Sequence, residues 1–168
     1  MAHLVQYNDE TYRERLFQLN VEYIEYLRDA AVRSLGVSGF YRNPREYVKG
    51  VFPEIASLTT YNGVIYLLVA GEETVGMGEL RKLEEGVGEI KRMFIRPEYR
   101  GRGYGREMMD RLVDKARELG YHTIRLSTAF FLEASVHMYR SAGFVERDKY
   151  PGAESNLGPH YIYMEKSL

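Results

Sequence analysis

One short segment constrains this chain more than any other feature. Residues 100–106 read Arg-Gly-Arg-Gly-Tyr-Gly-Arg and lie between a strand-like stretch and a helix-like stretch. Glycine lets the backbone adopt positive φ and approach a ligand closely. The unpaired N–H groups at the start of the following helix point into such a loop, where the helix dipole favours an anion. A phosphate group is therefore the expected ligand, and Arg100, Arg102 and Arg106 add positive charge suited to its oxygens.

The same residues exclude two common phosphate-binding patterns. The dinucleotide fingerprint requires a third small residue where Arg106 stands, and no acidic residue ends the next strand to bind a ribose. The P-loop of nucleotide triphosphatases requires Gly-Lys-Ser/Thr, which does not follow. The pattern that remains is Arg-x-x-Gly-x-Gly, from Arg100 to Gly105. Two simpler interpretations stay open: the glycines form only a tight strand-to-helix connection, and Arg102 and Arg106 are solvated surface charges.

The pattern of apolar residues predicts an α+β fold with a mixed central sheet flanked by helices. Expected strands cover residues 3–7, 64–70, 74–83, 87–96, 123–128 and 161–165. Asn8 or Asp9 offers an N-cap to a first, long helix, and Pro44 begins a second, short helix that Gly50 and Pro53 close. Two more helices follow, one after the glycine loop and one that ends at residue 143. The length of 168 residues predicts a single domain over residues 1–168.

The strand before the glycine loop has an irregular pattern. Its alternation of apolar and polar residues is interrupted, because Met93, Phe94 and Ile95 are three apolar residues in succession. A β-bulge near residues 92–94 would allow neighbouring side chains to face the same side. A strand end that is buried on both faces explains the pattern equally well.

Composition excludes several classes of chemistry. The chain has no cysteine, which excludes a disulfide framework, a thiolate zinc site and a cysteine nucleophile. The four histidines lie far apart in the sequence, so no metal site is expected. The formal net charge of -1 gives no reason to expect nucleic acid or membrane as a partner. Because the N-terminus has neither a basic start nor a long apolar stretch, a cytoplasmic protein is expected.

Two segments together resemble the GNAT superfamily of N-acetyltransferases. Residues 89–109, with Arg-Pro-Glu-Tyr and Arg-x-x-Gly-x-Gly between a strand and an amphipathic helix, resemble its motif A. Residues 135–144, with Tyr139-x-x-x-Gly143-Phe144, resemble its motif B. The resemblance covers about residues 64–168 and implies the GNAT (acyl-CoA N-acyltransferase) fold. It also implies direct transfer of the acetyl group of acetyl-CoA to a primary amine in a ternary complex, and homodimers are frequent in the family.

The resemblance also implies roles for particular residues. Met93, Phe94 and Ile95 match the splayed strand segment whose backbone pairs with pantetheine. The residues that match the pyrophosphate-binding loop are Arg100, Gly101, Arg102, Gly103, Tyr104, Gly105 and Arg106. Tyr139 matches the tyrosine that protonates the departing CoA thiolate, and Glu89 occupies the position of the general base in the histone-modifying branch.

The proposed acid and base are chemically reasonable. A lysine-type amine, with a pKa of about 10.4, is protonated at neutral pH and must lose a proton before it attacks a thioester. A carboxylate such as Glu89 accepts that proton if burial raises its pKa. Glu79 on the neighbouring strand is the main competitor for this role. On periodicity alone Tyr139 is a core residue, and Glu89 is an exposed residue or the partner of a cation such as Lys91.

Two points leave the function open in part: one residue departs from the family pattern, and the acceptor amine is not identified. Leu132 stands where many members carry an asparagine at the start of the motif B helix, which removes one expected hydrogen bond on the pantetheine side. This departure supports one alternative, a catalytically silent CoA-binding module. A second alternative is an enzyme that transfers a longer acyl group or modifies protein N-termini. Tyr41, Tyr47 and Tyr61 are the candidates for the acceptor side, but no motif identifies the acceptor amine.

Overall fold

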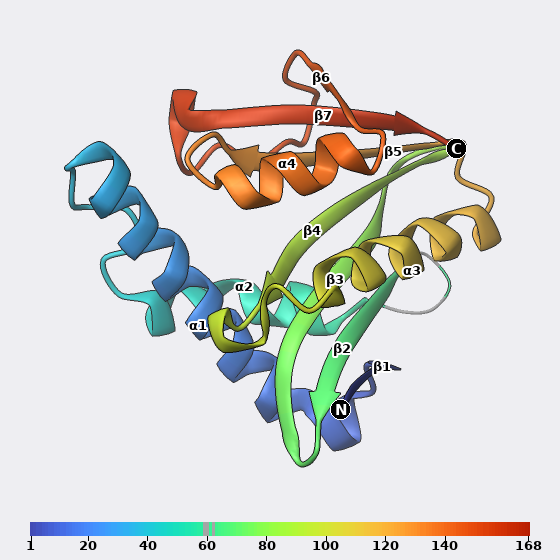
Figure 1. The fold of residues 1–168 in the computed structure, drawn as a ribbon, viewed down its shortest axis with the longest axis horizontal. Coiled ribbons are helices and arrows are strands. Elements are labelled where there is room, and N and C mark those ends of the chain that lie inside the picture. The colour runs from blue at the N-terminus through green and yellow to red at the C-terminus, as the bar shows by residue number, and fades with distance from the viewer. Residues whose placement is uncertain (59–60, 62) are drawn as a thin grey trace.

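The protein folds around one seven-stranded mixed sheet, in a computed structural model that describes residues 1–58, 61 and 63–168 (Figure 1). The strands are β1 (Ala2–Gln6), β2 (Val64–Ala70), β3 (Glu73–Glu84), β4 (Val87–Ile95), β5 (Thr123–Ala129), β6 (Val145–Arg147) and β7 (Tyr161–Ser167). The helices are α1 (Asp9–Leu35), α2 (Pro44–Ala56), α3 (Tyr104–Glu118) and α4 (Glu133–Ser141), with short 3-10 helices at Pro97–Tyr99 and Gly158–His160. The strand order is β1-β2-β3-β4-β5-β7-β6, and only β4 and β5 pair in parallel. The predicted α+β class with a mixed sheet is confirmed.

Hydrophobic side chains form a core on each face of the sheet. The core under α3 and α4 includes Leu80, Ile90, Met108, Leu112, Ile124 and Tyr139. The core under α1 and α2 includes Leu16, Ile24, Phe52, Leu67, Met77 and Phe94. Figure 1 shows α1 and α2 apart from α3 and α4 on either side of the central strands. Side chains of β4 enter both cores, so this strand is held from both faces.

β4 and β5 separate halfway along their length (Figure 1). They pair from Val87 opposite Thr123 to Ile90 opposite Leu126, and no further pairing between them follows in the described residues. We call the point after Ile90 and Leu126 the fork. Beyond the fork, β4 keeps β3 as its partner but loses its partner on the other edge.

A β-bulge in β4 accompanies the fork. Glu79 of β3 pairs with Lys91, but Met77, two residues earlier, pairs with Phe94, so β4 has one extra residue. Arg92 lies in this extra stretch with a φ of 52°, which is uncommon for a residue other than glycine. The bulge predicted near residues 92–94 is therefore confirmed, and it turns the end of β4 away from β5.

Local signals set most helix termini. Asn8, one of the two predicted N-caps, caps α1, because its side-chain oxygen accepts the N–H of Thr11 at 2.9 Å. Gly120 and Gly143, which follow α3 and α4, adopt φ values of 80° and 91°. Glycine adopts such values at little cost, so both residues mark the ends of these helices as predicted.

The end of α2 departs from the prediction. The helix begins at Pro44 as predicted, but the expectation that Gly50 and Pro53 close it is wrong, since both lie inside the helix. Proline in a helix removes one N–H donor and disturbs the preceding turn. Phe52 and Ile55 are buried in the core against α1, and their burial stabilises the last turn in spite of Pro53.

Two further features are absent from the described part of the chain. No helix among residues 1–58, 61 and 63–168 is both long enough and apolar enough to cross a membrane. Those residues also contain no group of three or more histidine, aspartate and glutamate side chains arranged to hold a metal ion.

Candidate active site

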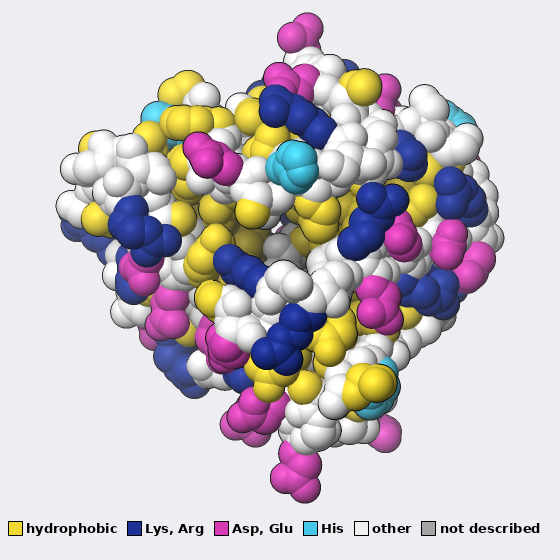
Figure 2. Space-filling model, viewed as in Figure 1, with side chains coloured by type: hydrophobic (Ala, Val, Ile, Leu, Met, Phe, Trp, Pro, Cys, Tyr) yellow, Lys and Arg dark blue, Asp and Glu magenta, His cyan; other side chains and the backbone are white. Residues whose placement is uncertain are grey.

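A cleft of about 400 Å³ opens at the fork between β4 and β5. It is bounded by α1 on one side, by α4 on the other, and by the glycine loop at one end. Figure 2 shows this face hollowed near its centre, with hydrophobic side chains around the opening and lysine or arginine side chains beside it. The predicted site residues that line the cleft are Glu89, Met93, Phe94, Ile95, Arg100, Gly101, Gly103, Gly105, Arg106 and Tyr139. Arg102 and Tyr104 are the two predicted site residues outside this lining.

The glycine loop presents free backbone N–H groups to the cleft. Gly101 and Gly103 have φ values of 73° and 85°, which other residues rarely adopt. Among the described residues, the amides of residues 101–106 donate to no backbone carbonyl, and Glu107 is the first to do so, to Gly103 at 3.0 Å. Gly105 packs closely on α4, where an added Cβ would lie 3.3 Å from the sulfur of Met138. The start of α3 therefore has the unpaired donors and the positive dipole end that an anion requires.

The arginines of the loop differ in what they contact. Arg106 lines the cleft, is about half exposed and pairs with Asp110 at 2.9 Å. Arg102 lies outside the cleft, where its guanidinium stacks 5.5 Å from the ring centre of Tyr99. Tyr104 also turns away, because its hydroxyl accepts the N–H of Ala2 at 3.4 Å, so only its backbone amide is available to a ligand.

Arg100 fastens the loop to the end of β4 and to α1. Its Nε donates to the carbonyl of Ile95 at 2.7 Å, and its Nη1 donates to the hydroxyl of Tyr26 at 2.9 Å. The guanidinium also lies 4.3 Å from the ring centre of Tyr26, a favourable cation–π distance. This residue therefore stabilises the splayed end of β4 in addition to supplying a positive charge beside the glycine loop.

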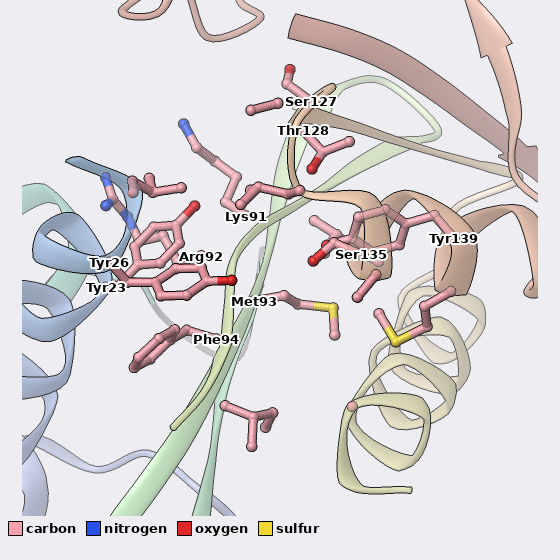
Figure 3. A pocket seen from close by; sticks show the side chains of 18 of the residues that line it. Tyr23, Tyr26, Lys91, Arg92, Met93, Phe94, Ser127, Thr128, Ser135 and Tyr139 are labelled. Carbon is pink, nitrogen blue, oxygen red and sulfur yellow. The ribbon is translucent and has the colours of Figure 1, made fainter. Parts of the chain in front are cut away.

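The splayed part of β4 has a free backbone edge toward the cleft. Its pairing with β5 ends at Ile90, so the following residues have a strand partner only on the β3 side. Phe94 is buried between the rings of Tyr23 and Tyr26, each 5.8 Å away between ring centres. Met93 extends into the cleft instead (Figure 3). An extended ligand could pair with this edge as an added strand would.

Glu89 is a buried carboxylate that lines the cleft at the fork. It is 3% exposed, and its Oε2 accepts a hydrogen bond from the hydroxyl of Tyr150 at 2.8 Å. Its Oε1 lies 4.0 Å from Nζ of Lys91. Burial raises the pKa of Glu89, and the nearby Lys91 charge and the Tyr150 hydrogen bond oppose that rise. A buried carboxylate with one oxygen left without a hydrogen bond has the properties of a general base.

Glu79, the competing candidate, occupies a different environment. It is 2% exposed, but it faces the core under α1 and is not part of the cleft lining. Its carboxylate lies 3.6 Å from Nε of Arg92 and 4.0 Å from Nη1 of Arg81. Burial raises the pKa of Glu79, with the charge of Arg92 acting against that rise. The geometry separates the two glutamates: Glu89 faces the cleft, and Glu79 holds the bulge residue Arg92.

Tyr139 lies on the opposite wall of the cleft, on α4 (Figure 3). It is 7% exposed and packs against Phe144 with 6.0 Å between ring centres. Burial raises the pKa of the Tyr139 phenol, so the phenol is protonated at neutral pH. The side chain therefore belongs to the core, as its periodicity predicts, and also borders the cleft, as the motif predicts. Leu132, at the position where the family pattern has asparagine, lines the same wall.

The acceptor side of the cleft contains two of the three predicted tyrosines, together with residues that the sequence analysis did not identify. Tyr41 and Tyr47 line the cleft with 4.8 Å between ring centres, and Asn156 donates to the hydroxyl of Tyr47 at 3.0 Å. Tyr61 is 91% exposed and is not part of the lining, so its placement on the acceptor side is wrong. Glu154, which pairs with Lys91 of β4, also lines the cleft.

Tyr150 and Ser127 are further residues that sequence reasoning missed. Ser127 borders the cleft directly after the fork, and Tyr150 contacts both Ser127 and Glu89. Tyr150 lies in the segment between β6 and β7, outside both motifs. No local pattern separates it from the other 14 tyrosines of the chain.

Comparisons with known proteins agree with this geometry. The family described as Acetyltransferase (GNAT) matches residues 24–144. An IAA acetyltransferase of Azospirillum brasilense is 36% identical over 95 residues, which are 56% of this chain and 61% of that protein. The L-amino acid N-acyltransferase MnaT of Escherichia coli is 32% identical over 66 residues, 39% of this chain and 38% of that protein. The chain thus spans less than two thirds of the length of these two curated relatives.

A solved structure extends the likeness to the whole fold. The PaiA N-acetyltransferase of Thermoplasma acidophilum, solved in complex with coenzyme A, superimposes with a TM-score of 0.77 at 16% identity. The alignment covers 100% of this chain and 99% of that one. At this identity the likeness concerns the fold alone, whereas the family match covers well over half of the sequence. The chain therefore belongs to the GNAT family of acetyltransferases.

Proposed function

We propose that this protein transfers the acetyl group of acetyl-CoA directly to a primary amine in a ternary complex. The observation that carries the proposal is the arrangement of one cleft: a buried carboxylate on one wall, a buried phenol on the other and a loop of free amides at its end. Each part matches one need of the reaction, namely a base, an acid and an anion-binding loop.

The donor side fits coenzyme A by its backbone. The unpaired amides of residues 101–106 would bind the pyrophosphate, with Arg106 beside them. The free edge of β4 after Ile90 would hold the extended pantetheine arm, as a neighbouring strand would. Acetyl-CoA supplies the acetyl group as a thioester. Backbone N–H groups at the bulge would polarise the thioester carbonyl.

Glu89 at the fork and Tyr139 on the opposite wall of the cleft would move the protons. Glu89 takes a proton from the acceptor ammonium, so that the neutral amine attacks the thioester carbon. As the new C–N bond forms and the C–S bond breaks, Tyr139 gives its proton to the sulfur. The nitrogen then gives its second proton, through solvent, to the Tyr139 phenolate, and Glu89 releases the first proton to water. A phenol in a buried site donates less readily than one in water, but a thiolate in the same site is also a stronger base. The products are an amide and free coenzyme A.

Small amines, and free amino acids first among them, are the acceptors we propose to screen. One relative is named for L-amino acids, and further relatives carry the names L-methionine sulfoximine/L-methionine sulfone acetyltransferase and amino-acid acetyltransferase. The paired rings of Tyr41 and Tyr47, which line a cleft of about 400 Å³, also favour a small acceptor over a folded protein surface.

Calorimetric titration with acetyl-CoA tests the donor half directly. Gly103→Asp adds a side chain at a φ of 85° and a negative charge beside the expected phosphates, so binding should be lost. Gly120→Asp is a matched control, because its φ is 80°, an added Cβ meets nothing within 4 Å, and it lies at the other end of α3. Equal binding by both variants, or no binding by the folded wild type, would overturn the proposal.

Turnover separates an enzyme from a silent module. Release of free thiol is measured with a panel of amino acids and other small amines, for acetyl-CoA and for longer acyl-CoA donors. Tight acetyl-CoA binding without release on any amine would reject catalysis and leave a CoA-binding protein. Faster release with longer donors would replace the acetyl assignment.

A further inference from the structure

Tyr150 places its hydroxyl at the fork itself. The side chain is 1% exposed and comes from the segment between β6 and β7. The hydroxyl donates to Oε2 of Glu89 at 2.8 Å and lies 3.2 Å from Oγ of Ser127. Glu89 is the second-last residue of β4 that pairs with β5. Ser127 directly follows Leu126, the last residue of β5 that pairs with β4. The phenol thus bridges the two strands where their backbone pairing ends.

The ring of Tyr150 is fixed from several sides. The guanidinium groups of Arg125 and Arg147 lie 5.6 and 5.7 Å from its centre, within the range of a cation–π contact. Both arginines also bind Oε2 of Glu165, at 2.7 and 2.5 Å. Tyr163 packs edge-on at 6.0 Å between ring centres. These contacts leave the ring little freedom, so the direction of its O–H toward Glu89 is determined by the fold.

We infer that Tyr150 is a positioning residue, which holds Oε2 of Glu89 and thereby leaves Oε1 as the oxygen that accepts the proton from the acceptor amine. A carboxylate without such a partner would rotate, and either oxygen could turn away from the cleft. Only Oε2 has a hydrogen bond in the described structure, whereas Oε1 lies 4.0 Å from Nζ of Lys91 and has none. The inference rests on the proposed role of Glu89 as the base.

The bond to Tyr150 also sets the pH range in which Glu89 is ionised. The charged groups around Glu89 are Lys91 on the same strand, Arg81 on β3 and Glu154 from the segment before β7. Lys91 and Arg81 lower the pKa of Glu89, Glu154 raises it, and Tyr150 lowers it by hydrogen bonding. Removing the hydroxyl therefore raises the pKa of Glu89. Because the ionised form is the active base, the acidic limb of the activity profile then moves to higher pH.

Tyr150→Phe tests the inference, with Tyr163→Phe as a matched control. Tyr163 is a neighbouring tyrosine whose hydroxyl, within the described part of the chain, donates only to the carbonyl of Glu154, at 3.4 Å. In Tyr150→Phe we expect the acidic limb of kcat to move up by about one pH unit, so that kcat at any pH on that limb falls about tenfold. The KM for acetyl-CoA should stay constant, and Tyr163→Phe should keep the wild-type profile. An unchanged acidic limb in folded Tyr150→Phe would overturn the inference.

Two further measurements separate the possible failures. Full turnover by Glu89→Gln would reject the base itself, whereas a large loss in Glu89→Gln with a wild-type profile in Tyr150→Phe rejects only the positioning role. If Tyr150→Phe does not fold, 3-fluorotyrosine incorporated at position 150 keeps the ring nearly the same size. Its more acidic hydroxyl donates a stronger hydrogen bond, so the acidic limb should move to lower pH, and an unmoved limb contradicts the inference.

Discussion

The two halves of the cleft are built in different ways. The proposed donor half, residues 91–95 and 101–106, offers its backbone to a ligand: a free strand edge and a set of unpaired amides. The acceptor half consists of Tyr41, Tyr47, Glu154 and Asn156, whose side chains come from two segments far apart in the sequence. Glu89 and Tyr139 lie between them.

This difference has a consequence for specificity. A backbone site depends on the conformation of the loop and the strand, and it suits a donor molecule that does not change. A side-chain site can change with single substitutions while the donor half is preserved. Substitutions at the base should therefore alter turnover, those in the donor half should alter acetyl-CoA affinity, and those in the acceptor half should alter only acceptor affinity.

The largest effect is expected from Glu89→Gln. The amide cannot accept a proton, so kcat at neutral pH should fall by about 100-fold to 1,000-fold. Glutamine has nearly the same shape as glutamate, and acetyl-CoA affinity measured by calorimetry should therefore not change. Glu79→Gln is the control for loss of a buried carboxylate on the other face of the sheet. A larger loss of kcat in Glu79→Gln would assign the base to Glu79 and break the division between the halves.

A smaller effect is expected from Tyr139→Phe. An alkyl thiol such as that of cysteine has a pKa of about 8.5, so a thiolate leaves more easily than an alkoxide or an amide anion would. Loss of the acid should therefore lower kcat by about tenfold to 100-fold, less than loss of the base. Steady-state kinetics at saturating acetyl-CoA provide the test. A constant kcat would mean that water or another group protonates the sulfur.

The sequence predicted the backbone geometry of the glycine loop and of the end of β4 well, because the signals for both are local. Glycines 101 and 103 require positive φ, and a helix start beside them supplies free amides within the same short segment. The interrupted alternation of apolar and polar residues at 93–95 likewise indicated the neighbouring β-bulge. Six of the seven strands were predicted within two residues for the same reason, since alternation is a property of neighbouring residues. The three-residue strand β6 was not predicted, because so short a segment shows no alternation.

The remainder depends on contacts between distant segments. Pro53 appeared to end a helix, but burial of Phe52 and Ile55 against α1 carries the helix past it. Tyr150 lies 61 residues from Glu89 in the sequence, and only the fold shows that the two meet. Tyr61 was chosen on the same ground as Tyr47, a tyrosine in the segment before β2, and yet its side chain is exposed to solvent. Local pattern carries no information on such pairings.

Arg100→Lys should have an intermediate effect and tests how the donor half is held in place. Lysine keeps the positive charge but cannot bond the Ile95 carbonyl and the Tyr26 hydroxyl together as the guanidinium does. We expect about 1–2 kcal/mol lower stability in urea unfolding, because two hydrogen bonds of a charged group are lost. Acetyl-CoA affinity should fall about tenfold, since the end of β4 loosens. Unchanged stability and affinity would show that charge alone matters at this position.

Tyr47→Phe should have the smallest effect and is the most specific test of the acceptor half. The change removes one hydroxyl, which accepts a hydrogen bond from Asn156 at 3.0 Å, and keeps the ring that packs on Tyr41. Loss of one such bond corresponds to about threefold to tenfold in the KM for the acceptor amine. The KM for acetyl-CoA should not change, because no group of residues 91–95 or 101–106 is touched. Tyr61→Phe, at an exposed position outside the cleft, is the control. Parallel changes in both KM values would mean that the two halves of the cleft are coupled and that acceptor binding reorganises the donor site.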